Sequence, residues 1–379
     1  MRQSERGRVD PFIVMDVMEA ARRAEAAGRH VIHMEVGQPA TPAPLGARQA
    51  LIRAMEAGPL GYTVALGLPE LRARIARLYA DWYGVDLNPD RVVVTAGASG
   101  AFVLAFSALF DAGERVGLGL PGYPSYRHIL KAMSLTPVGI ETAPQHRFQP
   151  VPEDLPPDLA GLILASPGNP NGTMLDRAQM AALAEAAAAR GAALISDEIY
   201  HGIDYDRRPV SALEITDDAY VVNSFSKYFS MTGWRVGWLV VPEAHVRTVE
   251  RLAQNMFICP PHASQVAALA AMDCDDELQA NLAVYAENRR LMLEGLPGAG
   301  FPTFAPPDGA FYVYADVSHL TDDSLDLSRR ILDGAGVAAT PGLDFDPGRG
   351  HRTLRFSYAR SRADIAEGLR RLGAFTAAL

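Results

Sequence analysis

Short apolar runs rich in β-branched residues alternate along the chain with longer segments of helical periodicity. The runs lie at residues 91–95, 115–118, 161–165, 193–196, 219–223 and 236–241. Strands that are buried on both faces are continuously apolar, whereas half-exposed strands alternate between apolar and polar residues. The pattern therefore predicts an α/β fold in which a large, mainly parallel sheet lies between helices.

One of the helices is marked at both ends. Asp176 is a suitable N-cap, Gln179 completes a capping box, and Gly191 follows the last turn. The apolar positions that we expect on its buried face are Met180, Leu183 and Ala187. The alanine-rich run between these ends indicates a stable helix and not a low-complexity linker.

The pattern changes after residue 274. A long charged helix is predicted at 277–293, and strands are predicted at 310–314 and 353–357 with another helix between them. This order is typical of a smaller α+β domain. We therefore place a large domain at residues 41–275 and a small domain at residues 276–379.

Composition narrows the classes of partner. The 379 residues carry a formal net charge of -9, which argues against nucleic acid or an anionic membrane as a partner. Cys259 and Cys274 are the two cysteines and neither lies in a ligand motif, so no metal site is predicted. The first residues are polar and no apolar run is long enough to span a membrane, so we expect a cytoplasmic protein.

The segment with the clearest chemistry contains Lys227 and, eight residues later, Arg235. Lys227 comes soon after the predicted strand 219–223, and the carboxyl ends of parallel strands are where open α/β sheets bind ligands. A buried lysine readily loses its proton, and a neutral amine attacks aldehydes. The arginine keeps its charge and offers a fork suited to phosphate. Pyridoxal 5′-phosphate carries both groups.

Residues 224–237 match every position of the lysine signature of class I and II aminotransferases. The chain resembles this family of the pyridoxal-phosphate-dependent superfamily, which has the aspartate aminotransferase-like fold, from about residue 36 to residue 359. The resemblance implies a seven-stranded-type sheet in the large domain. It also implies that residues 1–40 form an N-terminal arm and complete the small domain. Lys227 would form the Schiff base with the cofactor and move protons during the reaction.

The resemblance also implies a set of residues on the cofactor phosphate. Ala98 and Ser99 belong to the turn that opens a helix after the strand 91–95, although such a turn can be an ordinary tight loop. Ser224 and Arg235 match phosphate-contacting positions. Tyr62 matches the tyrosine that reaches the phosphate of the neighbouring subunit, which predicts a homodimer with shared active sites. The alternative for Tyr62 is a core tyrosine beside a turn.

Other matched residues would contact the cofactor ring. Asp197 would pair with the pyridine nitrogen, although an aspartate at a strand end is often a simple cap. Tyr200 and Asn169 would form hydrogen bonds with the phenolic oxygen, and Tyr123 would stack on the ring. The alternative for Asn169 is a purely structural turn, and the alternative for Tyr123 is ordinary packing within a loop. Glu198, next to Asp197, is interpreted as structural.

Arg355 and Gly37 are the predicted contacts of the substrate carboxylate, together with Asn169. An arginine in the apolar strand 353–357 needs a partner, which is either an internal carboxylate or the α-carboxylate of an amino acid. Phe12 and Val14 stand where one aspartate-specific branch of the family has hydroxyl residues. Ser99 stands where that branch has a lysine. The resemblance implies that these positions contact the substrate side chain and that in that branch they hold its distal carboxylate, so the apolar replacements disfavour an acidic side chain.

These features predict a transaminase, with Lys227, Asp197 and Tyr200 as catalytic residues. It would move an amino group from a neutral, aliphatic or aromatic L-amino acid to a 2-oxo acid. A pyridoxal-phosphate-dependent lyase or deaminase is the alternative, because the first chemical steps are shared. A ligand-sensing regulator would need an additional DNA-binding module and a basic face, which this sequence does not indicate.

Overall fold

The computed structural model describes residues 2–379. Within these residues the apolar runs form a seven-stranded sheet with the order β2-β8-β7-β6-β5-β3-β4. The strands are β2 (Val92–Thr95), β3 (Arg115–Leu120), β4 (Thr136–Glu141), β5 (Gly161–Ala165), β6 (Ala193–Asp197), β7 (Ala219–Ser224) and β8 (Gly237–Val240). Neighbouring strands from β4 to β7 pair in parallel, whereas β8 is antiparallel to both β2 and β7. The mainly parallel sheet predicted from the sequence is confirmed.

The strand β4 was not predicted because it lies at the edge of the sheet. Of its six residues only Ile140 is buried, and Pro137 and Gly139 interrupt any apolar run. Proline is tolerated at such an edge, where one side of the strand makes no ladder bonds. An edge strand therefore lacks the continuous apolar signal of the inner strands.

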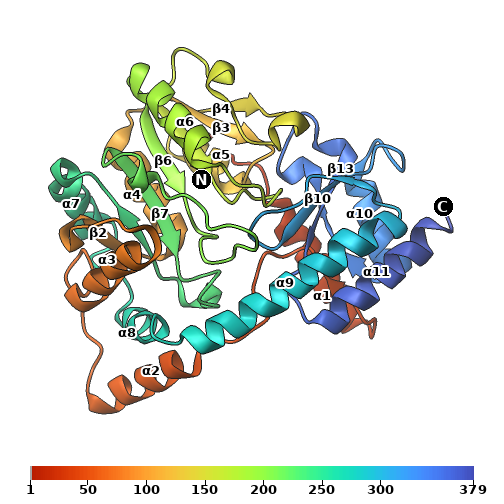
Figure 1. Ribbon diagram of the computed structural model, residues 1–379, viewed down its shortest axis with the longest axis horizontal. Coiled ribbons are helices and arrows are strands. Elements are labelled where there is room, and N and C mark those ends of the chain that lie inside the picture. Colours follow the sequence, from red (N-terminus) through yellow and green to blue (C-terminus); the bar gives the residue numbers. More distant parts are fainter. Residues whose placement is uncertain (1) are drawn as a thin grey trace.

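Helices cover both faces of the sheet (Figure 1). Successive strand residues point to opposite sides, so Val92 and Val94 belong to one apolar core and Val93 to another. The first core also contains residues of α3 (Pro69–Tyr83), α6 (Arg177–Ala189) and α8 (His262–Ala271). The second contains residues of α4 (Gly97–Leu109), α5 (Pro124–Ala132) and α7 (Val246–Met256). The predicted capping box and buried face of α6 are present.

The C-terminal part of the chain forms a second sheet on the right of Figure 1. Its antiparallel order is β12-β13-β10-β9. The strands are β9 (Thr303–Phe304), β10 (Tyr312–Asp316), β12 (Thr340–Pro341) and β13 (Thr353–Ser357), and the helices nearby are α9 (Asp275–Gly298), α10 (Ser324–Ala335) and α11 (Arg362–Thr376). The long helix α9 begins beside α8 and ends near this sheet.

The N-terminal segment packs on the C-terminal part. The strand β1 (Ile32–His33) pairs in parallel with β11 (Val337–Ala338), and α1 (Ile13–Ala26) contacts β11 and β12. The helix α2 (Leu45–Ala57) instead packs along α8. The domain boundaries at residues 40 and 275 stay a prediction. Among residues 2–379 no helix combines the length and the apolar character that a membrane span requires.

Candidate active site

A cavity of about 300 Å³ lies beside the carboxyl ends of β5, β6 and β7. The predicted site residues that line it are Gly37, Ala98, Ser99, Tyr123, Asn169, Asp197, Tyr200, Lys227, Arg235 and Arg355. These residues come from segments that are up to 318 positions apart in sequence, since Gly37 and Arg355 face the same space (355 minus 37). The residues that follow β5, β6 and β7 come together because the carboxyl ends of parallel strands meet at one edge of the sheet. Gly37 and Arg355 reach the same cavity from the N-terminal segment and from β13.

Lys227 lies in the turn after β7, with its side chain directed toward Gly37. Its Nζ donates a hydrogen bond to the carbonyl oxygen of Gly37 at 2.5 Å. Removal of the amine from water lowers the pKa of Lys227 to about 7, and the positive charges of Arg355 and Arg235 act in the same direction. Near neutral pH a large fraction of the amine is therefore uncharged and nucleophilic.

Asp197 is the last residue of β6, with 4% of its surface exposed. Its carboxylate accepts hydrogen bonds from the Tyr126 hydroxyl and from the backbone N–H of Ile199, the latter at 3.0 Å. Burial raises the pKa of Asp197 to about 6, against the opposing effects of these two bonds and of the Lys227 charge. A cation placed in the cavity near this carboxylate would stabilise its ionised form.

The role of Tyr126 was not predicted from the sequence. Tyr126 follows Tyr123 by three residues at the start of α5, and the two rings pack edge to face at 5.3 Å between centroids. Tyr123 is the N-cap of α5 and Tyr126 is the third residue of the helix, and this spacing was the available signal. Nothing in the local sequence indicates that the Tyr126 hydroxyl reaches Asp197.

The turn at the start of α4 requires a glycine. Gly97 has a φ of +71°, and a Cβ atom at this position would lie 2.4 Å from the guanidinium of Arg235. The following residues, Ala98 and Ser99, lie in the first turn of α4, where backbone N–H groups have no partner within the helix. The close approach of Arg235 to a helix N-terminus makes this end of the cavity suitable for a phosphate group.

Ser224 does not line the cavity. Its hydroxyl oxygen lies 2.9 Å from that of Ser226 and 3.1 Å from the carbonyl oxygen of Val236, and Ser226 is the serine that faces the cavity. The predicted phosphate contact of Ser224 therefore stays a prediction. Tyr62 also lies outside the cavity, with 82% of its surface exposed.

Tyr200 and Tyr312 form a pair of hydroxyl groups 2.7 Å apart at the cavity wall. Burial holds the pKa of Tyr200 well above its usual range, so its hydroxyl keeps its proton and can donate it in a hydrogen bond. Tyr312 was not identified from the sequence because the apolar strand 310–314 gives no sign of a polar role for it. Gly37 lies directly against the Tyr312 ring.

Arg355 lies in β13 with 3% of its surface exposed. Its Nη1 donates to Asn169 Oδ1 at 2.9 Å, and its Nη2 donates to the carbonyl oxygen of Glu35. The guanidinium lies 4.4 Å from the centre of the Tyr312 ring and 4.7 Å from that of Phe345. Within residues 2–379 no carboxylate lies within 4.0 Å of it, and its Nε makes no hydrogen bond.

The internal ion pair considered for Arg355 is therefore absent from the described part of the chain. A buried cation whose direct hydrogen-bond partners are all neutral is expensive unless an anion joins it. Since the guanidinium faces the cavity, this anion can be a bound carboxylate.

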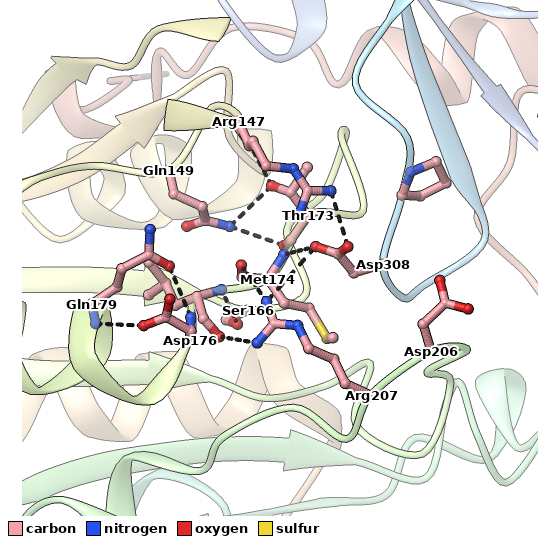
Figure 2. A network of polar contacts seen from close by, with 12 residues as sticks. Arg147, Gln149, Ser166, Thr173, Met174, Asp176, Gln179, Asp206, Arg207 and Asp308 are labelled. Atoms are coloured by element: carbon pink, nitrogen blue, oxygen red, sulfur yellow. Dashed lines mark hydrogen bonds and ion pairs between the residues drawn. The ribbon is translucent and has the colours of Figure 1, made fainter. Parts of the chain in front are cut away.

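Ser166 and Thr173, which flank the loop that carries Asn169, belong to the polar network of Figure 2. Asp308 accepts hydrogen bonds from Arg147 Nη2 and from the backbone N–H of Met174, both at 2.9 Å. A Cβ atom on Gly172 would lie 2.5 Å from Pro307, so the glycine of the Asn-Pro-x-Gly sequence permits this close contact. The loop therefore requires a glycine at position 172 for its own packing, in addition to the predicted role of Asn169 at the cofactor.

Glu198 has a structural environment, as expected. Its buried carboxylate accepts hydrogen bonds from the hydroxyls of Ser196 and Ser211 and from the backbone N–H of Ala212. Burial raises its pKa to about 8. It does not line the cavity, unlike its neighbour Asp197.

An apolar wall of the cavity comes from the N-terminal segment. Phe12, Val14, Met15 and Met18 line it, and the first two are the residues that the sequence placed at the substrate side chain. Phe102 and Ile129 add further apolar surface. None of these six residues can neutralise a second carboxylate.

Comparison with known proteins gives a consistent result. The family model for aminotransferase class I and II matches residues 29–372. A valine--pyruvate aminotransferase of Mycobacterium tuberculosis is 47% identical over 98% of this chain and 97% of its own length. A crystal structure of a candidate aminotransferase from Silicibacter pomeroyi has 68% identity, a TM-score of 0.96 and full coverage of both chains. An aspartate aminotransferase from Thermus thermophilus, solved with maleate, has 30% identity and a TM-score of 0.92 over 99% of this chain and 100% of its own.

Proposed function

The chain belongs to the class I and II aminotransferases, and from this premise we propose that it transfers the amino group of a neutral L-amino acid to a 2-oxo acid. The observation that carries the proposal is the buried Arg355 guanidinium, which has no carboxylate partner within the described residues and faces a cavity with an apolar wall. Arg355 would bind the α-carboxylate of the substrate. The apolar residues of α1 would then contact its side chain.

The same geometry argues against an acidic donor. A second carboxylate against Phe12, Val14 and Met15 would lose its hydration without gaining a cation, at a cost of several kcal/mol. The valine--pyruvate aminotransferase of M. tuberculosis supports an aliphatic donor and pyruvate as acceptor. The relatives with about 30% identity include aspartate aminotransferases, so membership of the family does not by itself decide the donor.

The cavity fits pyridoxal 5′-phosphate, the cofactor of this family. Gly97 leaves room for Arg235 beside the free N–H groups of α4, which suits the phosphate, and Asp197 offers a buried carboxylate to the ring nitrogen. Tyr123 would stack on the ring, and Asn169 and Tyr200 would bond its phenolic oxygen. Lys227 would hold the cofactor covalently through its uncharged amine. When bound, the cofactor supplies an aldehyde for amine exchange and a conjugated ring that withdraws electrons from the substrate.

The residues of the chain then have separate tasks. Arg355 and Asn169 orient the substrate through its carboxylate, while Lys227 Nζ, once free, takes the proton from Cα as a general base. The lowered pKa of Lys227 matches this task at neutral pH. Asp197 would stabilise a positive charge on the cofactor ring, and the Tyr126 hydroxyl orients the Asp197 carboxylate.

We also propose that two copies of the chain form the active unit. Tyr62 is exposed, and the bond between His262 Nδ1 and the carbonyl oxygen of Gly61, 2.9 Å long, joins its segment to the start of α8. Several apolar side chains on α2 and on the two segments beside this bond are exposed, namely Leu45, Ile52, Met55, Val64, Met256, Phe257 and Ile258. Such a surface is typical of an interface. Sedimentation should therefore give twice the chain mass of 40.8 kDa.

A screen of amino donors with pyruvate and 2-oxoglutarate as acceptors tests the proposed function. We expect valine and other neutral donors to exceed aspartate in kcat/KM by about tenfold or more, the scale of one missed polar contact. Aspartate as the best donor would contradict the proposal. Turnover that needs no added 2-oxo acid would instead indicate the lyase or deaminase chemistry.

A further inference from the structure

We infer that Asp344 is a positioning residue that sets the choice of amino donor by fixing α1 against the cavity. The inference rests on the proposed use of neutral donors and deepens it. Asp344 is the last residue of the short 3-10 turn η8 (Gly342–Asp344) and is fully buried. Its carboxylate oxygens accept hydrogen bonds from the backbone N–H groups of Ile13 and Val14, each at 3.1 Å.

These bonds cap α1 from a distant part of the chain. The N-cap residue of α1 is Phe12, whose side chain cannot accept a hydrogen bond, so the first N–H groups of the helix need an outside acceptor. A carboxylate at this position also interacts favourably with the positive end of the helix. Asp344 lies 330 residues after Val14, so the cap fixes the N-terminal helix to the C-terminal part of the molecule.

The capped end of α1 is the part that lines the cavity. Phe12 and Val14 lie on either side of the first capped N–H group, and Met15 and Met18 follow within the next two turns. The Phe12 ring also packs edge to face on Tyr123 at 5.9 Å. A movement of the capped turn would therefore displace the apolar wall.

The segment that holds α1 also contacts the carboxylate site. Phe345, the residue after Asp344, packs its ring 4.7 Å from the guanidinium of Arg355. The backbone of this segment is held in turn, since Arg127 Nη2 donates to the Asp344 carbonyl oxygen at 2.5 Å and Gly122 N–H donates to that of Phe345 at 3.0 Å. Residues 344–345 thus fix the spacing between the site for the substrate carboxylate and the wall for its side chain.

The variant Asp344→Asn in the cofactor-loaded enzyme tests this role. The asparagine oxygen accepts one of the two bonds, but its NH₂ group faces the other N–H, so the cap is weakened. We expect KM for valine to rise about tenfold, on the scale of a lost helix cap. KM for alanine, whose methyl group is too short to reach far along the wall, should change by less than about twofold, and kcat should change little for both donors. Amide hydrogen exchange should accelerate at residues 13–18.

The control is Asp323→Ala. Asp323 is the N-cap of α10, and one of its carboxylate oxygens accepts bonds from the N–H groups of Leu325 and Asp326 at 3.0 Å each. Alanine removes this cap, whereas asparagine would keep it, and no residue of α10 lines the cavity. This variant should lose thermal stability without a change in the ratio of valine to alanine kcat/KM. A second variant, Ile13→Pro, removes the backbone N–H of residue 13, which donates to Asp344. Proline is tolerated at this first position of a helix, so the variant should also raise KM for valine selectively.

Equal changes for valine and alanine in Asp344→Asn, or unchanged exchange at residues 13–18, would overturn the inference. A wild-type enzyme that uses neither donor would contradict the proposed function instead. In that case the exchange measurement in Asp344→Asn and Asp323→Ala still decides whether Asp344 holds α1.

Discussion

Gly37 and the hydroxyl group of Tyr312 are in such close contact that no side chain fits at position 37. A Cβ atom there would lie 1.7 Å from the Tyr312 hydroxyl oxygen and 2.7 Å from the ring carbon that carries it. The same glycine accepts the hydrogen bond from Lys227 Nζ through its carbonyl oxygen. One backbone position thus fixes both the Tyr200–Tyr312 hydroxyl pair and the amine of the lysine.

The variant Gly37→Ala should therefore damage the site more than the fold. The added methyl must displace Tyr312, and such overpacking costs about 1–3 kcal/mol. We expect kcat/KM to fall at least about tenfold. Gly298→Ala is the matched control, since nothing lies within 4 Å of a Cβ at that position. Normal kinetics in Gly37→Ala would show that Tyr312 can move without cost.

The lowered pKa of Lys227 can be measured through cofactor uptake by the apoprotein. Burial, aided by the charge of Arg355, lowers the pKa from its ordinary value of 10.5 to about 7. Only the uncharged amine reacts with an aldehyde, so the rate of uptake should rise with pH around a midpoint near 7 and level off above about pH 8. The variant Arg355→Met should move the midpoint upward.

Borohydride reduction followed by peptide mapping should find the label on Lys227, and a label on another lysine would refute the assignment.

Tyr126→Phe tests whether the Tyr126 hydroxyl supports the function of Asp197, a role that was not predicted from the sequence. The change removes the hydrogen bond from the Tyr126 hydroxyl to Asp197, a bond to a charged group worth about 1.5–3 kcal/mol. Turnover should fall about tenfold or more, and the affinity for the cofactor should also decrease. Tyr220→Phe, which removes a bond to His245 of 2.9 Å, is the control and should leave turnover unchanged. Equal effects in both variants would point to a general loss of stability.

Glu198→Gln should make stability less sensitive to pH. Burial raises the pKa of Glu198 from 4.5 to about 8, so the folded protein keeps this proton to a higher pH than the unfolded chain does. The stability that the group contributes is fully present below about pH 4.5 and is lost as pH rises toward 8. Glutamine keeps the bonds to Ser211 and Ala212 without ionising. The difference in Tm between Glu198→Gln and the wild type should therefore shift in favour of the variant by about 3 °C or more when thermal scans at pH 5 and pH 8.5 are compared. A difference in Tm that does not change with pH would contradict the raised pKa.

Arg355→Lys should weaken all amino donors to a similar extent. A lysine cannot reproduce the planar fork that binds a carboxylate through two bonds, so kcat/KM should fall at least about tenfold for each donor. Arg352→Lys, at an exposed ion pair with Asp322, is the control and should behave as the wild type. A loss confined to acidic donors would mean that Arg355 binds the side chain of the substrate and not its α-carboxylate.

The sequence alone determined the features that depend on neighbouring residues. The inner strand β5 and the capping box of α6 follow from local runs and spacings, and so does the position of Lys227 soon after a strand. The edge strand β4 was not predicted, because its half-exposed residues give no continuous apolar run. Signals of this kind are local because helix and strand periods are set by the backbone within a few residues.

Only the tertiary structure decided how these residues act together. Tyr126 and Asp197 are 71 residues apart, and Asp344 and Val14 are 330 apart, yet each pair is joined by a hydrogen bond. No period or local motif encodes such a contact, because it depends on which strands pair and how the two ends of the chain pack. Whether Arg355 has a carboxylate partner was open in the sequence for the same reason. In the folded chain the guanidinium donates directly to two neutral acceptors, Asn169 Oδ1 and the carbonyl oxygen of Glu35.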